Sequence, residues 1–240
     1  MLLQSVVQAI YPAQCLACDA LTDSDFGLCG PCRGDAHFIG GLVCDTCGTP
    51  LPGQDSGDAV QCDDCLQIAR PWSRGRAVFV YEGVGRKLVL GLKHGDRTDL
   101  VPPMAQWMAA RAKQIAEPGS VIVPVPLHWM RLVKRRYNQS ALLAQQMGRV
   151  LSWPVCVDAL LRRKRTKSLD GHDRAQRFAV LADAIAPNPK RMPDITGKSV
   201  VLVDDVMTSG ATLAACADAL QMAAAANVSI VTLARVAKDT

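Results

Sequence analysis

Two adjacent carboxylates, Asp204 and Asp205, follow an apolar run in the stretch SVVLVDDVMTSGATL. Residues 199–203 before them are typical of a strand that is buried on both faces. Because a buried pair of like charges is costly, we expect the two acids at the carboxyl end of that strand, in the crevice where parallel sheets bind ligands. Two carboxylates in this position can accept hydrogen bonds from vicinal hydroxyls or hold Mg2+ through water.

The turn after the acid pair is rich in groups that bind phosphate. Its hydroxyl donors are Thr208, Ser209 and Thr212. Gly210 permits a tight turn, and the helix expected from residue 211 presents free N–H groups at its N-terminus. An acid pair beside such a cradle fits a ribose 5-phosphate. The alternative interpretation is an ordinary strand followed by an N-capped helix.

Eight of the ten cysteines form four CxxC knuckles before residue 66. Each knuckle brings two thiolates onto one tetrahedral ion at about 2.3 Å, so four knuckles supply two closed four-cysteine Zn2+ sites. The predicted ligands are Cys15, Cys18, Cys29, Cys32, Cys44, Cys47, Cys62 and Cys65. All-thiolate sites leave no open coordination position, so we interpret both as structural. The spacing allows both sequential and interleaved pairing of the knuckles.

The cysteine pattern also bears on the compartment. No export signal precedes the knuckles, which favours a reducing, cytoplasmic location. The opening apolar stretch lacks a basic segment and a cleavage site, and Pro12 stops it early, so we interpret it as a short packing helix rather than a signal peptide. No apolar run reaches the roughly 18 to 20 residues that cross a bilayer, so we expect no membrane insertion.

The net charge of +5 is unevenly distributed. Residues 1–70 carry two basic and nine acidic side chains, which gives −7, whereas the remaining 170 residues carry 25 basic and 13 acidic side chains, which gives +12. We therefore expect polyanions to be drawn to the second part of the chain. The alternative interpretation of these charges is simple solvation of the surface.

Strand-like and helix-like segments alternate after the linker RPWSRG. Strands are predicted at 76–83, 121–127, 154–161, 199–206 and 228–236, and helices at 85–95, 102–117, 140–151, 177–185 and 211–226. Basic loops are expected at 128–139 and 162–176. This alternation predicts an α/β fold with a mostly parallel sheet and helices on both faces, preceded by a small zinc-ribbon module. We place the module at 1–70 and the α/β domain at 71–240.

The stretch VVLVDDVMTSGATL resembles the PRPP-binding signature of type I phosphoribosyltransferases. The resemblance implies that Asp204 and Asp205 engage the ribose 2- and 3-hydroxyls. It also implies that the loop holds the 5-phosphate through Thr208, Ser209, Gly210, Ala211 and Thr212. With its cysteine-rich start, the whole chain is similar to the ComF (GntX-like) family of competence proteins, whose VPVPLH…R…RGFNQ segment matches VPVPLHWMRLVKRRYNQS, with Arg136 at the usual glycine.

The same resemblance assigns two further loops. Arg135, Arg136 and Tyr137 correspond to the loop that grips pyrophosphate in type I enzymes. The stretch RRKRTKSLDGHDRA corresponds to the mobile loop that closes over PRPP, although the usual glutamine near Ser168 is missing. Arg165 and Lys167 in this loop are therefore candidate catalytic residues alongside the acid pair.

The implied activity is transfer of a phosphoribosyl group from PRPP, with Mg2+, to an unidentified acceptor, with release of pyrophosphate. The alternative is a non-catalytic accessory protein for DNA uptake, which binds PRPP or single-stranded DNA through the basic loops and works with a DNA-uptake protein partner. Base stacking would have few aromatic side chains in these loops, namely Trp129 and Tyr137.

Overall fold

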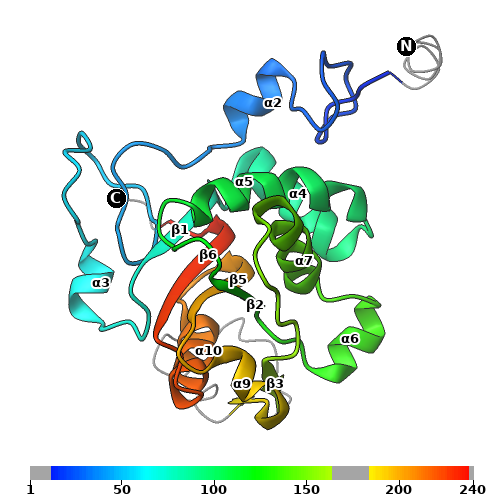
Figure 1. Cartoon of the computed structure of the whole chain (residues 1–240). Helices are drawn as coiled ribbons and strands as arrows, with labels where there is room; N and C mark the ends of the chain where they lie inside the picture. The colour runs from blue at the N-terminus through cyan, green and yellow to red at the C-terminus, as the bar shows by residue number, and fades with distance from the viewer. Residues whose placement is uncertain (1–11, 164–183, 238–240) are drawn as a thin grey trace.

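The computed structural model describes residues 12–163 and 184–237. Its centre is a four-stranded parallel sheet in the order β1-β6-β5-β2 (Figure 1). The strands are β1 (Gly75–Val80), β2 (Val121–Pro124), β5 (Ser199–Met207) and β6 (Asn227–Arg235). Residues 200–203 of β5 are all buried between two neighbouring strands, which explains why the sequence is continuously apolar there.

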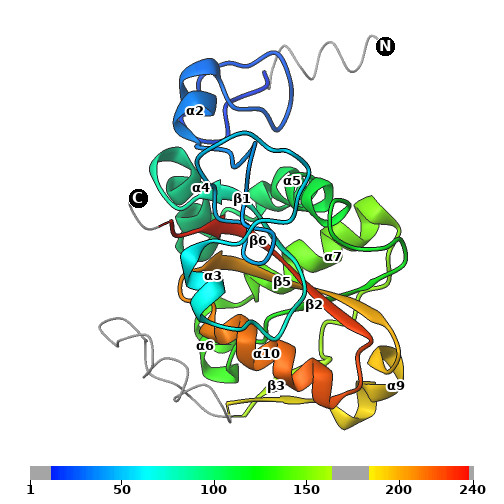
Figure 2. The same ribbon diagram turned by 90° about the vertical axis from the view of Figure 1, so that its left-hand side faces the viewer.

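Helices cover both faces of the sheet, as Figure 2 shows. One face carries α4 (Gly83–His94), α5 (Val101–Ala112) and α7 (Gln139–Leu151), and the other carries α10 (Ala211–Met222). The shorter helical segments are α2 (Gly30–Asp35), α3 (Asp63–Gln67), η1 (Thr98–Leu100), α6 (Trp129–Arg135), η2 (Pro189–Arg191) and α9 (Met192–Ile195). The predicted α/β class with helices on both faces is confirmed.

Local sequence explains where the helices near the acid pair begin. Two prolines occupy the first turn of α5, where their missing N–H groups cost nothing. Asn138 caps α7 by accepting hydrogen bonds from the amides of Ser140 (3.0 Å) and Ala141 (3.4 Å). Its amide nitrogen donates to Val125 O at 3.0 Å, which fixes the start of α7 beside the end of β2.

The strand predicted at 154–161 is wrong in its length. Val155 forms a single parallel bridge with Ile122, and the chain then leaves the sheet. A separate antiparallel pair follows, made by β3 (Leu160–Arg162) and β4 (Ile185–Pro187). The chain turns at residues 157–158, and the Asp158 carboxylate pairs there with Arg191 at 2.9 Å.

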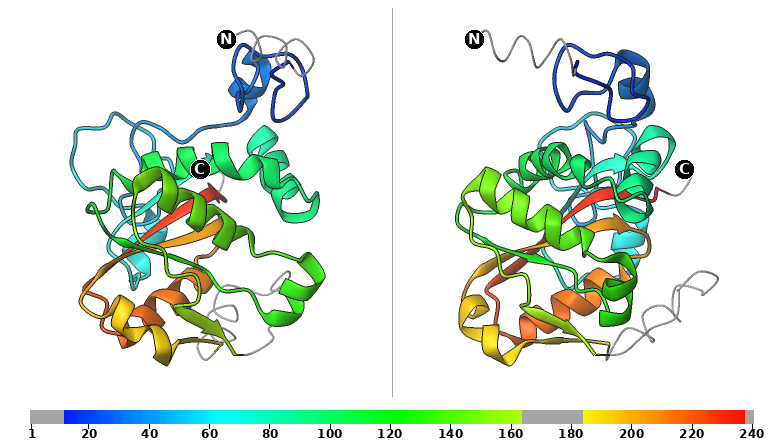
Figure 3. Two further views of the ribbon diagram at one scale, coloured as in Figure 1. Left: turned by 45° about the vertical axis from the view of Figure 1, so that its right-hand side comes forward. Right: turned by 90° about the vertical axis from the view of Figure 1, so that its right-hand side faces the viewer.

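The basic segment 128–139 is not a simple loop, because it contains α6. His128 caps this helix, and its Nδ1 accepts from Met130 N at 3.3 Å. Arg136 ends the helix in a left-handed conformation (φ 67°), a position that glycine usually takes. Figure 3 shows α6 standing out from the body of the domain. Of the helix predicted at 177–185, residues 177–183 lie outside the described residues, and the end of the prediction is wrong because Ile185 begins β4.

The two cysteine-rich segments pack into different hydrophobic clusters. We call residues 12–40 the first ribbon and residues 41–70 the second ribbon. The first ribbon contributes Cys15, Leu16, Ala17 and Ala36 to the cluster under α4, α5 and α7. The second contributes Cys44, Cys47 and Cys65 to the cluster under α10. The boundary at residue 70 stays a prediction, and the second ribbon shares its core with the α/β domain.

None of the helices in the described ranges combines the length and the apolarity that crossing a bilayer requires. The cytoplasmic location stays a prediction.

Candidate functional site

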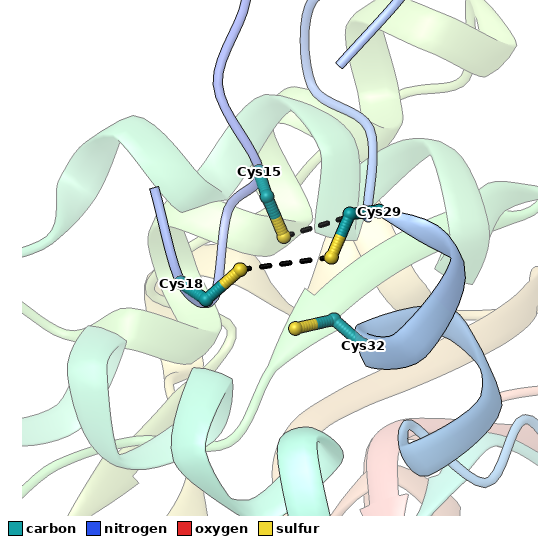
Figure 4. Close-up of side chains that lie close together, drawn as sticks. All are labelled: Cys15, Cys18, Cys29 and Cys32. Atoms are coloured by element: carbon teal, nitrogen blue, oxygen red, sulfur yellow. Dashed lines mark hydrogen bonds between the residues drawn. The ribbon is translucent and has the colours of Figure 1, made fainter. Parts of the chain in front are cut away.

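Four cysteines of the first ribbon converge on one point, as Figure 4 shows. They are Cys15, Cys18, Cys29 and Cys32, and their sulfur atoms all lie within 4.8 Å of one another. The sulfurs of Cys18 and Cys29 are 3.6 Å apart. Four sulfurs at about 2.3 Å from a tetrahedral zinc would be separated by about 3.8 Å, so the donor set fits Zn2+.

The second ribbon repeats this arrangement with Cys44, Cys47, Cys62 and Cys65. The Cys47 and Cys62 sulfurs are 3.7 Å apart. The pairing of the knuckles is therefore sequential, which settles the alternative that the spacing left open. Both sites have four thiolates and no open position, so the prediction of two structural zinc sites is confirmed.

The acid pair lies within β5, because the strand extends to Met207 rather than ending at residue 203. The Oδ2 atom of Asp205 accepts a hydrogen bond from Gln139 Nε2 at 2.7 Å and lies 3.3 Å from Lys93 Nζ. Oδ1 of Asp204 accepts from Ser140 Oγ at 3.0 Å. Residues of α4 and of the first turn of α7 thus hold both carboxylates at the carboxyl end of the sheet.

The electrostatics of the acid pair depend on two adjacent carboxylates and one nearby ammonium group, that of Lys93. Burial, reinforced by the charge of Asp205, raises the pKa of Asp204 to about 7. The Lys93 ammonium and the Ser140 hydroxyl offset part of this rise. Asp204 therefore exchanges a proton near neutral pH, and a ligand that needs its charged form competes with that proton.

Gln139 adds an unused acceptor to this environment. Its side chain is buried, and its Oε1 atom has no hydrogen-bond partner among the described residues. Tyr137 fixes the preceding segment on α4 by donating from its hydroxyl to Leu92 O at 2.6 Å. Because Leu92 precedes Lys93, this bond links the segment before α7 to the lysine that contacts the acid pair.

Residues 208–212, which we call the 208–212 turn, connect β5 to α10. Gly210 takes a left-handed conformation (φ 81°) and stands as the N-cap of α10, so glycine is required there for its backbone. Ser209 Oγ accepts from Ala211 N at 3.5 Å. The amides of residues 208, 209 and 210 donate to no acceptor within the described residues. Free amides before a helix N-terminus form a site suited to an anion.

Arg135 and Arg136 lie at the end of α6, next to Tyr137. Within the described part of the chain, the partners of the two carboxylates come from α4, α7 and the backbone of β5, and neither arginine is among them. The structure therefore does not bring these arginines onto the acid pair, and their pyrophosphate role stays a prediction. Arg165 and Lys167, like the rest of 164–183, lie outside the described residues.

Sequence reasoning did not select the residues that surround the acid pair. Lys93, Gln139 and Ser140 were absent from the predicted site, although the first lies in the LVLGLKHG segment and the other two follow Asn138 directly. The signal that could have identified them was their polarity at the ends of largely apolar helices: Lys93 lies at the end of α4, and Gln139 and Ser140 lie at the start of α7. Their distance from Asp204 along the chain, 64 residues for Ser140, hid the contact.

Comparison with known proteins identifies both parts of the chain. Residues 6–66 match the family described as double zinc ribbon domain, and residues 120–240 match the phosphoribosyl transferase domain. DNA utilization protein YhgH of Salmonella typhi is 31% identical over 234 residues, which covers 93% of this chain and 97% of the relative. The chain belongs to the ComF family.

Other relatives carry competence names. Competence protein F of Haemophilus influenzae is 29% identical over 203 residues, which covers 77% of this chain and 86% of the relative. Competence protein ComFC of Bacillus subtilis is 27% identical over 246 residues, 94% and 96% respectively. A solved structure of the allosteric regulatory enzyme of purine biosynthesis aligns loosely, with a TM-score of 0.41 and 18% identity over 60% of this chain and 30% of that one.

Proposed function

We propose that the carboxyl edge of the sheet binds PRPP with Mg2+ and transfers its phosphoribosyl group to an acceptor. The carrying observation is the placement of the acid pair, which is held by Gln139, Ser140 and Lys93 directly before the left-handed turn and free N-terminus of α10. Membership in the phosphoribosyl transferase domain family supports the same ligand class.

Each part of the edge has a proposed role. Asp204 and Asp205 would accept hydrogen bonds from the ribose hydroxyls, and the 208–212 turn would hold the 5-phosphate with its free amides. Mg2+ held by carboxylate oxygens and pyrophosphate would neutralise charge on the leaving group. Lys93, whose Nζ lies 3.3 Å from Asp205 Oδ2, would hold that carboxylate in place.

In the proposed reaction the bond between ribose C1 and the pyrophosphate oxygen breaks, and pyrophosphate leaves with the electron pair. The acceptor forms a new bond to C1 and loses its proton to water. The chain contributes positioning and charge stabilisation rather than a covalent nucleophile. Arg135, Arg136 and Tyr137 are proposed to contact pyrophosphate. Arg165 and Lys167 are proposed to close over the substrate.

Calorimetry with PRPP and Mg2+ tests the binding step. We expect the double variant Asp204→Asn with Asp205→Asn to lose at least about tenfold in affinity, because amides keep the shape but remove the charge. Asp218→Asn, which alters an exposed acid on α10, is the matched control and should bind normally. Equal affinity for wild type and the double variant would refute the proposed site. A screen of acceptor bases for pyrophosphate release then tests the transfer step.

The pH dependence of binding provides a second test. Since the pKa of Asp204 is raised to about 7, its ionised fraction grows as pH rises through 7. PRPP affinity should therefore increase roughly tenfold between pH 6 and 8 beyond the ligand's own titration. Asp204→Asn should remove this component. The unliganded protein should lose stability over the same rise, because folding favours the protonated acid.

The alternative, a surface that binds single-stranded DNA, would use the exposed side chains of α6. Trp129 and Val133 on α6 are 65% and 73% exposed, and Arg135 and Arg136 lie at the end of the same helix. Exposed aromatic and cationic groups stack on bases and neutralise phosphates. DNA binding of this kind should weaken steeply with salt and fall in Trp129→Ala, while PRPP binding should remain. A partner in DNA uptake is suggested only by the names of the relatives.

A further inference from the structure

The last residue of the second ribbon, Arg70, and the linker that follows it contact the 208–212 turn directly. Arg70 donates from Nη1 to Ser209 O at 2.9 Å, across 139 residues of chain. Its guanidinium group lies 5.5 Å from the centre of the Trp72 ring, and Trp72 is buried. The turn is therefore supported from behind by residues that belong to neither β5 nor α10.

Packing around Gly210 shows how close this support is. A Cβ atom at Gly210 would lie 2.7 Å from Met207 Cε, 3.0 Å from Arg70 Nη1 and 3.3 Å from Trp72 Cη2. The left-handed turn thus has no room for a side chain on the linker side. Its backbone conformation depends on the linker as well as on the absence of a side chain.

Trp72 also reaches the second zinc site. Its indole Nε1 donates to Thr46 O at 2.7 Å, and Thr46 lies between the ligands Cys44 and Cys47. Gln221 of α10 donates to Pro71 O at 3.0 Å, which fixes the linker along that helix. A continuous line of contacts therefore runs from the Cys44/Cys47 knuckle of the second zinc site through Trp72 to the turn.

A second guanidinium group supports the same turn from β6. Arg235 is buried and donates from Nη1 to Met207 O at 3.2 Å and to Thr208 O at 2.5 Å. Together with Arg70, it binds three successive carbonyls, of residues 207, 208 and 209. In a trans peptide the N–H points opposite to the C=O, so the amides of residues 208–210 point away from the two arginines.

From these contacts we infer that Arg70, Trp72 and Arg235 are positioning residues for the 208–212 turn, and that the second ribbon thereby forms part of the phosphate site. By binding the carbonyls from behind, the arginines hold the free amides in one orientation toward an anion. Their two positive charges also favour a bound phosphate. The anion itself rests on the proposed function, whereas the support of the turn does not.

Three variants of the full-length, zinc-loaded protein test this inference. Arg70→Ala removes the carbonyl contact, and Trp72→Phe keeps an aromatic ring, a smaller one, but removes the bond to Thr46. Arg33→Ala is the matched control, because Arg33 in the first ribbon also lies 5.5 Å from the centre of a ring, that of Phe38. Arg33 belongs to α2, which Figure 1 shows at the opposite end of the molecule from α10. Zinc content and thermal unfolding establish that each variant is folded with two ions.

Hydrogen–deuterium exchange of residues 205–214 without ligand is the first readout, and calorimetry with PRPP and Mg2+ is the second. We expect faster exchange in Arg70→Ala and Trp72→Phe, with roughly tenfold and threefold weaker PRPP binding. Arg33→Ala should match wild type in both. If Arg70→Ala does not fold, Arg70→Lys takes its place. Trp72→Phe is measured as a separate variant in either case.

The outcomes separate the two proposals. Unchanged exchange and affinity within twofold of wild type in a folded Arg70→Ala or Trp72→Phe protein would overturn the positioning role. Failure of wild type to bind PRPP would overturn the proposed function, and the exchange data would still decide the positioning role. Equal loss in Arg33→Ala would mean that the effect is general destabilisation, which also overturns it.

Discussion

The first and second ribbons hold the same four-cysteine ligand set but differ in what surrounds it. In the second ribbon Cys44, Cys47 and Cys65 are at most 5% exposed and belong to the core of the α/β domain. In the first ribbon Cys18 is exposed and two other ligands are half-buried. The first site is therefore more exposed than the second, although its Cys15 is buried in the cluster under α4, α5 and α7.

Attachment to the domain differs in the same direction. Asp45, between two ligands of the second ribbon, pairs with Arg74 at 3.0 Å and with Arg76 at 2.8 Å on the segment that forms β1. The first ribbon attaches through its end, where Asp35 Oδ2 accepts from Val84 N at 2.9 Å and Phe38 packs on Phe79. The lesson is that a zinc site stabilises whichever structure its ligands are buried in.

Replacement of one ligand in each ribbon should give the largest contrast. Cys47→Ser should destabilise the whole domain by at least about 4 kcal/mol, because it removes a metal and leaves polar groups in the core. Cys18→Ser should cost the domain less than about 1 kcal/mol while lowering zinc content from two ions to one. Urea unfolding with zinc analysis measures both, and similar losses would abolish the distinction between the ribbons.

Two glycines provide a smaller contrast without touching a ligand. A Cβ at Gly75 would clash with Thr46 O and lie 2.8 Å from Ile230 Cγ1, so Gly75→Ala should destabilise by about 2–3 kcal/mol. At Gly34, inside α2, a Cβ meets nothing within 4 Å. Gly34→Ala should be neutral or stabilise by up to about 0.5 kcal/mol through helix propensity. Thermal unfolding of both variants measures the difference. A neutral Gly75→Ala would contradict the close packing of the second ribbon against β1.

Two aspartates test the polar attachments. Asp45→Ala leaves Arg74 and Arg76 without their carboxylate and should cost about 2 kcal/mol, since this carboxylate is mostly shielded from solvent. Asp35→Ala removes the bond to Val84 N at the start of α4 and an exposed contact with His37 Nε2 at 3.8 Å, and should cost about 1 kcal/mol. Denaturant midpoints would rank them, and a reversed order would place the tighter attachment in the first ribbon.

Metal removal should separate the ribbons by rate. A chelator should extract the first ion at least about tenfold faster than the second, a difference of about 1.4 kcal/mol in activation free energy, because Cys18 is exposed. Near-ultraviolet circular dichroism, to which Trp72 beside the second site contributes, should change when the second ion leaves. A single release phase would show that the two sites open together.

Local chemistry made part of this structure predictable. The cysteine spacing, the apolar strand before Asp204 and the glycine of the 208–212 turn each carry their meaning within a few residues. Helix α6 was missed because its basic residues were interpreted as loop, although Met, Leu, Lys and Arg favour helices and His128 supplies the cap. Patterns among neighbouring residues therefore predict an element when the residues of that element determine its geometry.

Contacts between distant segments were not predictable in the same way. Lys93 with Asp205, Gln139 with Asp205 and Arg70 with Ser209 arise only when the sheet is assembled. Nothing in the linker RPWSRG distinguishes an arginine that supports a turn from one that is solvated. The candidate site was therefore found through its strand and turn, while the residues that hold it came only from the structure.

The burial of the second ribbon also has a consequence for synthesis on the ribosome. Arg70 and its partner Ser209 are 139 residues apart, and translation proceeds at roughly 5–20 residues per second. The second ribbon therefore emerges on the order of ten seconds before the surface that will enclose it. During that interval its thiols are exposed to oxidation unless they already hold zinc, so we expect metal loading of the nascent chain before the domain that encloses the metal has folded.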